Sequence, residues 1–325
     1  MKTHVIQCNG FISPALVFVA FVLAAFAGLA ETRVEKLRAK LASGDRNHVF
    51  VAMHRGDWRN YPENSKGAIE SCIRLGADIV ELDVARTKDG RFILNHDGSL
   101  DRTTTGKGLV ADYTLEELKK LKLRGNQGGQ EAVATDYNVL SLEEAIELTR
   151  GRILMNIDHF TQYPREILDV VEKCGATKEV LVKATFGYDK SREFFGERHW
   201  RKVMSGELLY MPVIRFCWGE HKASATNLSE WIAHEPRPCS MYEMCFDSDE
   251  GEAQLKKLDG VAGAPRIWVN TLWDSLDNKR PDTLALKDPD AVWGWCATNR
   301  VTMIQTEYGK EALDYLRSRG RHDDL

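Results

Sequence analysis

Two stretches decide the fold of this 325-residue chain: Val49-Phe-Val-Ala-Met-His-Arg-Gly56 and Asp78-Ile-Val-Glu-Leu-Asp-Val84. Each contains a short run of apolar and β-branched residues bounded by glycine or polar residues, which predicts a buried strand. Arg91-Phe-Ile-Leu-Asn95 predicts a third strand on the same grounds. Each run ends in a polar group, and in parallel α/β barrels active sites are built where the strands end.

Two carboxylates lie on one face of the second strand. The period of two places Glu81 and Asp83 about 7 Å apart along the strand, while Leu82 points the opposite way. Carboxylates at strand ends are usually solvated or cap helices. Two on an inward apolar face are costly unless a cation compensates them, so the pair predicts a metal site.

The other strands end in histidines and an arginine. His54 and His96 follow the first and third strands, and Arg55 comes next to His54. A lone buried histidine is more often a satisfied core residue than a catalyst. Two imidazoles for proton transfer, an arginine for an anion and a carboxylate pair for a cation together indicate phosphodiester cleavage.

The order and spacing of these pieces resemble the glycerophosphodiester phosphodiesterase family, over roughly residues 48 to 318. Each motif alone is weak, and their succession is specific. The strong motifs are His54-Arg-Gly56, Pro62-Glu-Asn64, Gly76-Ala-Asp78, Glu81-Leu-Asp83, Thr87-Lys-Asp-Gly90, His96-Asp97 and Leu100-Asp-Arg-Thr-Thr-Thr-Gly106. Weaker echoes follow at Asn156-Ile-Asp158, Trp268-Val-Asn270 and Ile304-Gln-Thr-Glu307.

The resemblance implies a role for each residue of the site. His54 matches the family's catalytic base, His96 its acid and Arg55 its phosphate-binding arginine, although the sequence itself is symmetric between the two histidines. The matched metal ligands are Glu81, Asp83 and, where the family usually has glutamate, Asp158.

Two departures from the family pattern concern positive charge and the C-terminal motif. Phe160 stands where the family frequently has lysine, and Lys183, which ends the next strand-like run, supplies the missing charge if its side chain points inward. The family's Thr-Asp-x-Pro is replaced by Thr306-Glu-Tyr-Gly309, which leaves the role of Glu307 open.

Local signals place the helices. Asn64 is expected to cap a helix over Ser65–Leu75 that Gly76 ends, and Glu63 is equally compatible with the site and the surface. Capping boxes begin at Thr114 and Ser141, and Pro164 opens another helix. The polar, glycine-rich segment 124–139 predicts a long loop at the mouth of the site.

Strand and helix signals alternate along the chain, which predicts an α/β fold, a (β/α)8 TIM barrel, in one domain. With the first three, the strand candidates number nine, one more than a barrel needs, so at least one is peripheral. The further candidates are 153–157, 180–183, 208–214, 241–246, 266–269 and 302–305.

The front of the chain predicts secretion. Residues 11–30 form an apolar run after a short segment with Lys2, and small residues near its end offer cleavage points. We expect residues 1–30 to be a signal peptide, with the mature domain over 31–325 and a secreted or periplasmic location. An uncleaved membrane anchor is the alternative.

The charge and the cysteines of the chain limit the classes of binding partner and the disulfides that we expect. A formal net charge of −4 argues against a general nucleic-acid binder. Among the seven cysteines, Cys72 and Cys174 fall on apolar helical faces as expected thiols, and the spacing of Cys217, Cys239 and Cys245 makes them the first candidates for a disulfide.

The predicted activity is metal-dependent hydrolysis of glycerophosphodiesters to an alcohol and glycerol 3-phosphate. All-oxygen ligation suits one Mg²⁺ or Ca²⁺, without choosing between them. Trp268 and Trp273 either wall the substrate or pack in the core. The alternatives are phospholipase-type or cyclising cleavage, in which a substrate hydroxyl attacks the phosphorus, and a secreted binding protein without turnover.

Overall fold

The computed structural model describes residues 30–234, 240–259, 261 and 265–325. Within it, Arg33–Leu325 form one compact unit. The predicted signal peptide lies outside the described residues, apart from its last position. Among the described helices, none is long and apolar enough to cross a membrane.

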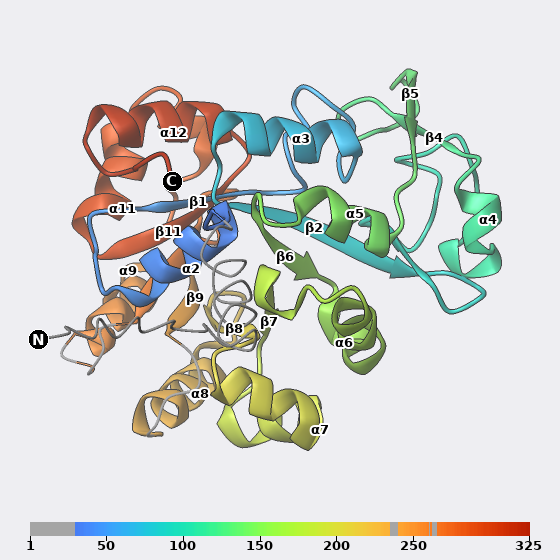
Figure 1. The fold of residues 1–325 in the computed structure, drawn as a ribbon. Coiled ribbons are helices and arrows are strands. Elements are labelled where there is room, and N and C mark those ends of the chain that lie inside the picture. Colours follow the sequence, from blue (N-terminus) through green and yellow to red (C-terminus); the bar gives the residue numbers. More distant parts are fainter. Residues whose placement is uncertain (1–29, 235–239, 260, 262–264) are drawn as a thin grey trace, which may run out of the picture. The chain divides into compact units, whose positions relative to one another are not determined.

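Eight parallel strands form a closed barrel, which confirms the predicted (β/α)8 fold (Figure 1). The barrel closes because β1 pairs with both β2 and β11. Around the barrel the strands are β1 (Phe50–Met53), β2 (Ile79–Arg86), β6 (Leu154–Asp158), β7 (Val180–Ala184), β8 (Leu209–Phe216), β9 (Met241–Phe246), β10 (Arg266–Asn270) and β11 (Val301–Thr306).

Of the nine predicted strands, the third, over residues 91–95, is the one that lies outside the barrel. β3 (Phe92–Leu94) pairs antiparallel with the last residues of β2, from Val84 to Arg86. The sequence predicts that His96 follows a barrel strand. This is wrong, because β3 runs antiparallel to the barrel strands and is not one of them. His96 comes to the mouth from the returning arm of a hairpin, and Asn95 N donates to the backbone oxygen of Asp83 at 3.1 Å.

Helices connect the barrel strands, and four of them begin where the local signals predict, near residues 65, 114, 141 and 164. Helix α3 has Ser65 rather than Asn64 as its N-cap, and it ends at Gly76 in the left-handed conformation. The capping boxes at Thr114 and Ser141 are both formed. The α-helices are α2 (Arg33–Ala42), α3 (Lys66–Leu75), α4 (Leu115–Leu118), α5 (Leu142–Thr149), α6 (Pro164–Lys173), α7 (Tyr188–Met204), α8 (His221–Ala233), α9 (Asp249–Glu252), α10 (Asp282–Ala285), α11 (Trp295–Thr298) and α12 (Gly309–Ser318).

Short 3₁₀ and π turns complete the connections. They are η1 (Val110–Asp112), η2 (Phe160–Gln162), η3 (Thr177–Glu179), η4 (Ala253–Leu258) and the π-helical η5 (Asp290–Gly294).

The predicted long loop over 124–139 is only partly a loop. Its two ends belong to an antiparallel pair, β4 (Lys122–Arg124) and β5 (Ala134–Asn138). Both strands are short, and β5 is mostly polar, so neither carries the apolar alternation that marks a strand in a sequence.

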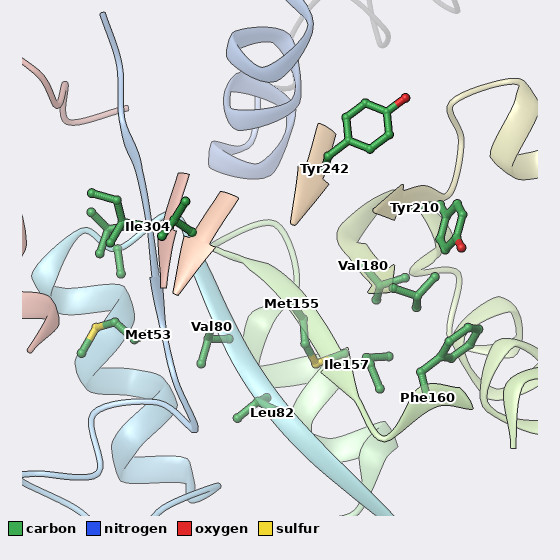
Figure 2. Packing of buried hydrophobic residues seen from close by; sticks show 14 of the residues in the cluster. Met53, Val80, Leu82, Met155, Ile157, Phe160, Val180, Tyr210, Tyr242 and Ile304 are labelled. Carbon is green, nitrogen blue, oxygen red and sulfur yellow. The ribbon is translucent and has the colours of Figure 1, made fainter. Parts of the chain in front are cut away.

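Alternation along the barrel strands separates two apolar layers. Side chains such as Val80 and Leu82 pack between the strands and the helices, in the cluster that Figure 2 shows in part. Another set from the first residues of the strands fills the barrel floor, where Val34, Leu37 and Leu41 of α2 cover it.

Two positions further along, the side chains in the same alternation row are polar in the barrel strands other than β8, where Val213 is apolar. This step from an apolar floor to a polar layer places the charged groups at the C-terminal mouth, where barrel enzymes carry their sites. Its buried or half-buried members are Glu81, Asn156, Lys183, Glu243, Asn270 and Gln305.

The structure places Trp268 in the floor and not on the wall of the mouth. Its side chain is fully buried among the apolar floor residues, and its Nε1 donates to Asn270 Oδ1 at 2.7 Å. The substrate-binding role expected for Trp268 is therefore wrong, because the residue lies one layer too deep. Trp273, which lies beyond the end of β10, is half-exposed at the mouth.

The cysteines of the described chain are free thiols. Cys217 and Cys245 lie in one small apolar cluster with Val213, Leu272 and Leu276 and form no disulfide with each other, while Cys239 lies outside the described residues. Cys72 is buried as expected, and Cys174 is only half-buried.

Candidate active site

A cavity of about 350 Å³ opens at the C-terminal mouth of the barrel. It brings together six of the eight residues that the sequence singled out. They are His54, Arg55, Asp83, His96, Asp158 and Lys183. Glu81 is fully buried next to them, and Trp268 lies in the floor.

Three carboxylates converge on the β2–β6 side of this cavity. Glu81, Asp83 and Asp158 each offer an oxygen within 4.8 Å of the others. Glu81 Oε2 accepts from the backbone N–H of Arg55 at 2.8 Å, whereas Oε1 is buried without a hydrogen-bond partner among the described residues. Burial, and then the charges of Asp83 and Asp158, raise the pKa of Glu81 well above its usual range. An all-oxygen set with an unsatisfied buried atom fits a divalent cation.

Asn64 orients one of these carboxylates and caps no helix. Its Nδ2 donates to Asp83 Oδ2 at 2.9 Å, and its Oδ1 accepts from the backbone N–H of Asp83 at 3.0 Å. Asn64 adopts a left-handed conformation with φ of 57°. Because both ends of the amide bind one residue, the position of Asp83 is fixed before any cation arrives.

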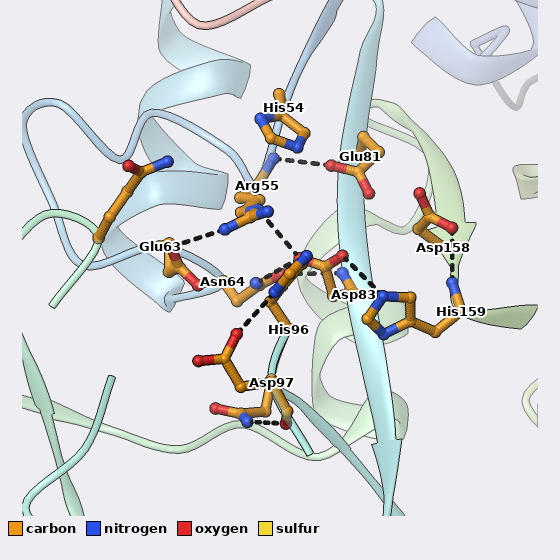
Figure 3. A network of polar contacts seen from close by, with 12 residues as sticks. His54, Arg55, Glu63, Asn64, Glu81, Asp83, His96, Asp97, Asp158 and His159 are labelled. Atoms are coloured by element: carbon orange, nitrogen blue, oxygen red, sulfur yellow. Dashed lines mark hydrogen bonds and ion pairs between the residues drawn. The ribbon is translucent and has the colours of Figure 1, made fainter. Parts of the chain in front are cut away.

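Arg55 is held from both sides by acidic groups. Its Nη1 lies 3.2 Å from Glu63 Oε2, and its Nε lies 3.5 Å from Asp83 Oδ2. Figure 3 shows Asp83 between Arg55, Asn64 and His159. Glu63 is almost fully buried, so it belongs to the support of the site and not to the surface.

Arg102 connects this support to the second histidine. It makes a bidentate contact with Glu63, at 2.8 and 3.0 Å, and binds Asp97 through Nε at 2.7 Å. Asp97 Oδ1 in turn lies 2.7 Å from His96 Nδ1. Hydrogen bonding to Arg102 holds the pKa of Asp97 well below its usual range. An ionised carboxylate only accepts, so the Nδ1 proton of His96 points at Asp97 and Nε2 is left for chemistry.

His54 has the same arrangement, with a carboxylate from the far end of the chain. Glu307 Oε1 lies 3.2 Å from His54 Nδ1, and Arg59 lies 3.4 Å from the other oxygen. The backbone N–H of Glu307 donates to Asp282 at 2.7 Å. The residue that the family comparison left open therefore orients a predicted catalytic histidine.

The final helix can approach closely enough because its first residue is glycine. A Cβ on Gly309 would lie 2.5 Å from the sulfur of Met53, the last residue of β1. The change from Thr-Asp-x-Pro to Thr-Glu-Tyr-Gly thus accompanies a close contact between the ends of the chain that carry His54 and Glu307.

Lys183 supplies the charge that is missing at Phe160. Phe160 is buried in the outer apolar cluster, whereas Lys183 Nζ lies 3.6 Å from Asp158 Oδ2 and 3.2 Å from Glu243 Oε2. Burial acts to raise the pKa of Asp158, but the charge of Lys183 and the backbone N–H of His159 bring it down to about 2. The lysine thus keeps Asp158 ionised, which is the state in which a carboxylate can bind a cation.

Sequence reasoning missed several residues of the pocket, and two of them, Glu243 and His159, lie beside the residues that it did predict. Glu243 is a lone carboxylate within the apolar strand β9, a signal that was present in the sequence. His159 follows the strand-end Asp158 in a left-handed conformation, and its ring lies 5.1 Å from that of His96. Its Nε2 is 4.0 Å from Asp83 Oδ1, so it adds a third imidazole to the mouth.

Known proteins with similar sequences match parts of the chain. A glycerophosphodiester phosphodiesterase of Caldanaerobacter subterraneus is 47% identical over 97 residues, which are 29% of this chain and 40% of that protein. One from Bacillus altitudinis is 45% identical over 110 residues, 33% of this chain and 44% of that protein. The matched stretches therefore span less than half the length of these relatives.

Solved structures share the fold over most of the chain. A glycerophosphoryl diester phosphodiesterase from Parabacteroides distasonis has a TM-score of 0.67 and 21% identity, covering 90% of this chain and 94% of that one. An Oleispira antarctica phosphodiesterase in complex with the product sn-glycerol-3-phosphate has a TM-score of 0.55 and 19% identity, covering 83% and 96%.

Family profiles divide the barrel between them. Residues 210–316 match a domain of unknown function, and this region supplies β8 to β11 of the same barrel. Residues 54–216 match the Glycerophosphoryl diester phosphodiesterase family, and they contain the three candidate metal-binding carboxylates, His54 and His96. The chain belongs to that family.

Proposed function

We propose that this protein is a metal-dependent hydrolase that cleaves glycerophosphodiesters to an alcohol and glycerol 3-phosphate. The observation that carries the proposal is the convergence of three carboxylates beside two histidines, each with a carboxylate at its Nδ1. The product in the Oleispira antarctica complex, sn-glycerol-3-phosphate, supports this choice of substrate class.

The charges assign a role to each group. When bound by Glu81, Asp83 and Asp158, a divalent cation supplies Lewis-acid polarisation of the phosphoryl group. Arg55 binds the phosphate and offsets the negative charge that develops in the transition state. His54 accepts the proton of the attacking water at Nε2, and His96 gives its Nε2 proton to the departing alkoxide. Glu307 and Asp97 stabilise the two imidazolium forms.

The first experiment measures hydrolysis of glycerophosphoglycerol by the purified protein. Activity should vanish with a chelator and return with Mg²⁺ or Ca²⁺, because oxygen ligands suit both ions. Incorporation of ¹⁸O from labelled water into glycerol 3-phosphate identifies hydrolysis, whereas a cyclic phosphate without label would show attack by a substrate hydroxyl. Full turnover in rigorously metal-free protein would contradict the metal role.

The second experiment separates the two histidines. His96→Ala should lose about 10²- to 10⁴-fold on glycerophosphoglycerol and largely recover on a nitrophenyl phosphodiester, whose leaving group needs no proton. His54→Ala should be impaired on both substrates. Equal losses for His96→Ala on the two leaving groups, with cation binding intact, would remove the acid role from His96.

The N-terminal apolar run supports a further part of the proposal, export of the protein. A signal peptide cleaved between Gly28 and Glu31 would deliver the barrel to a secreted or periplasmic location. N-terminal mass analysis of the native product tests this. An intact Met1 on a membrane-bound product would favour an anchor instead.

A further inference from the structure

The two halves of the cavity differ in character. The half made by β1, β2 and β6 carries the histidine, the arginine and the carboxylates of the proposed chemistry. The opposite half, made by β8 to β10 and the segments that follow them, has the polar side chains Arg215, Glu243 and Asn270 among the largely apolar Val213, Trp218, Cys245, Leu272, Trp273 and Leu276. The proposed reaction uses none of these residues.

Arg215 is the positively charged side chain on this second wall, and the carboxylate of the same wall, Glu243, is paired with Lys183. It lies four strands around the barrel from His54, since β8 and β1 are opposite in the closed order. Its neighbours Val213, Cys217 and Cys245 belong to a buried apolar cluster. An arginine on an apolar wall of a pocket needs an anionic partner to offset its loss of hydration.

That partner is absent from the described part of the chain. No carboxylate there lies within 4.0 Å of the Arg215 guanidinium, whereas Arg55 and Lys183 in the same cavity each contact two acidic groups. The guanidinium of Arg215 lies 5.7 Å from the ring centre of Trp218. The cavity therefore holds a cation whose hydrogen-bond donors remain available to a ligand.

The same contacts disfavour a cationic headgroup. Exposed tryptophans at a pocket mouth are a common way to bind quaternary ammonium groups. Here the guanidinium already lies beside the ring of Trp218, and the ring of Trp273 lies 5.8 Å from His54 in an edge arrangement. Of the two carboxylates beside this wall, Glu243 is paired with Lys183, and Asp247 accepts from the backbone N–H of Trp218 at 3.2 Å.

We propose that the pocket selects glycerophosphodiesters whose second substituent carries its own negative charge, and that Arg215 recognises that charge. The proposal rests on the hydrolysis described above, because it assigns the opposite end of the same substrate. A phosphate group matches the planar donor fork of arginine better than a hydroxyl does. The second substituent would extend from the scissile phosphate across the mouth to β8.

Three substrates that differ in the charge of this substituent test the proposal. They are bis(glycerophospho)glycerol, with a second phosphodiester, glycerophosphoglycerol, with an uncharged glycerol, and glycerophosphocholine, with a cation. A charge-assisted contact predicts a kcat/KM for the first substrate that is roughly 10- to 100-fold above that for the second. The choline diester should be slower than both.

Variants identify the residue responsible. In Arg215→Gln the ratio of kcat/KM between bis(glycerophospho)glycerol and glycerophosphoglycerol should fall to about one, while Arg215→Lys should keep part of the preference. Arg192→Gln, which removes an exposed positive charge from α7, is the matched control and should keep the full ratio. In the wild-type protein the ratio should also shrink as ionic strength rises, which requires no variant.

The outcomes separate this inference from the proposed function. Hydrolysis of glycerophosphoglycerol with no preference for the anionic diester, or an unchanged ratio in Arg215→Gln, overturns the inference and leaves the hydrolase standing. Failure to cleave any of the three diesters with Mg²⁺ or Ca²⁺ present overturns both.

Discussion

Two buried carboxylates three residues apart on the same segment, Asp78 and Glu81, have opposite surroundings. Asp78 Oδ2 accepts from the backbone N–H of Val51 at 2.9 Å and lies 3.0 Å from His322 Nε2, while Arg33 lies 3.4 Å from the other oxygen. Glu81 has one donor and an oxygen without a partner in the described chain. The first carboxylate is satisfied by the protein itself, and the second is left open to a ligand.

The pKa shifts follow this difference. Burial acts to raise the pKa of Asp78, but hydrogen bonds from His322 and His48 hold it well below its usual range. Burial raises the pKa of Glu81, and the neighbouring carboxylates raise it further. The two carboxylates are equally buried, but only Asp78 has enough hydrogen-bond donors around it to remain ionised without a ligand. Glu81, at the mouth, lacks such donors and is available to bind a cation.

The floor cluster has ligand types that suit a metal, but its hydrogen bonds argue against one. His48, Asp78 and His322 could each offer an atom within 4.8 Å of the others. The backbone N–H of Asp323 donates to His48 Nδ1 at 3.1 Å, so the proton of the neutral ring is on Nε2, toward Asp78. A protonated nitrogen cannot bind a metal, and the cluster is better explained as a set of hydrogen bonds.

The largest effect is expected from Glu81→Gln. Loss of this proposed ligand should lower hydrolysis by roughly 10³-fold or more, because a bound cation would stabilise the transition state by several kcal/mol. Cation affinity, measured by calorimetry, should fall in parallel, while Asp78→Asn should keep the affinity of the folded protein. Equal cation binding in Glu81→Gln and wild type would remove the distinction between the two carboxylates.

The next effect concerns the stability of the floor. Asp78→Asn should lower the free energy of unfolding by about 1 to 3 kcal/mol, because it takes the anionic acceptor away from the buried donors of His48 and His322. Urea unfolding monitored by tryptophan fluorescence measures this. Glu81→Gln serves as the control and should lose far less stability, and a similar loss in both variants would show that burial alone matters.

Acid should act through the same floor carboxylate. The folded pKa of Asp78 is below its unfolded value of about 3.9, so its contribution is complete above that value and is lost as the pH falls toward the folded pKa. From about pH 4 downward, the free energy of unfolding should fall more steeply in the wild type than in Asp78→Asn. Parallel curves for the two proteins would mean that other groups control acid unfolding.

The smallest predicted effect is that of Asn64→Ala. Because Asn64 holds Asp83 by two hydrogen bonds, its loss should weaken cation affinity by roughly 10- to 100-fold, the usual effect of removing a group that orients a ligand. The histidine signatures on the two leaving groups should remain. Unchanged cation affinity would show that β2 alone positions the carboxylate.

Sequence patterns predicted the features that depend on residues close together in the chain, namely the strands and the face on which each side chain lies. All nine strands exist, since apolar runs and their boundaries are local, and alternation along β2 correctly set Glu81 and Asp83 against Leu82. The direction of β3 was not predictable, because a period of two is the same in parallel and antiparallel pairs. The depth of Trp268 was missed for a related reason, since alternation gives the face of a strand but not the layer.

Long-range partners were also beyond local patterns. The pairing of His54 with Glu307 joins residues 253 positions apart, and that of Asn64 with Asp83 crosses from a loop to a strand. The sequence predicts Asn64 as the cap of helix α3, but the cap is the next residue, Ser65. Arg215 gave no signal of its own, since an arginine at the end of a strand is ordinarily solvated.

The barrel closes by pairing β1 with β11, so during synthesis it cannot close until the end of the chain has been made. Ribosomes add about 5 to 20 residues per second, so roughly 12 to 50 s separate the synthesis of His54 from that of Glu307, 253 residues later. Throughout that interval the edge of β1 that will receive β11 faces solvent or a chaperone, since its partner has not yet been made. The nascent chain thus carries its three candidate metal-binding carboxylates well before it has a closed barrel to hold them.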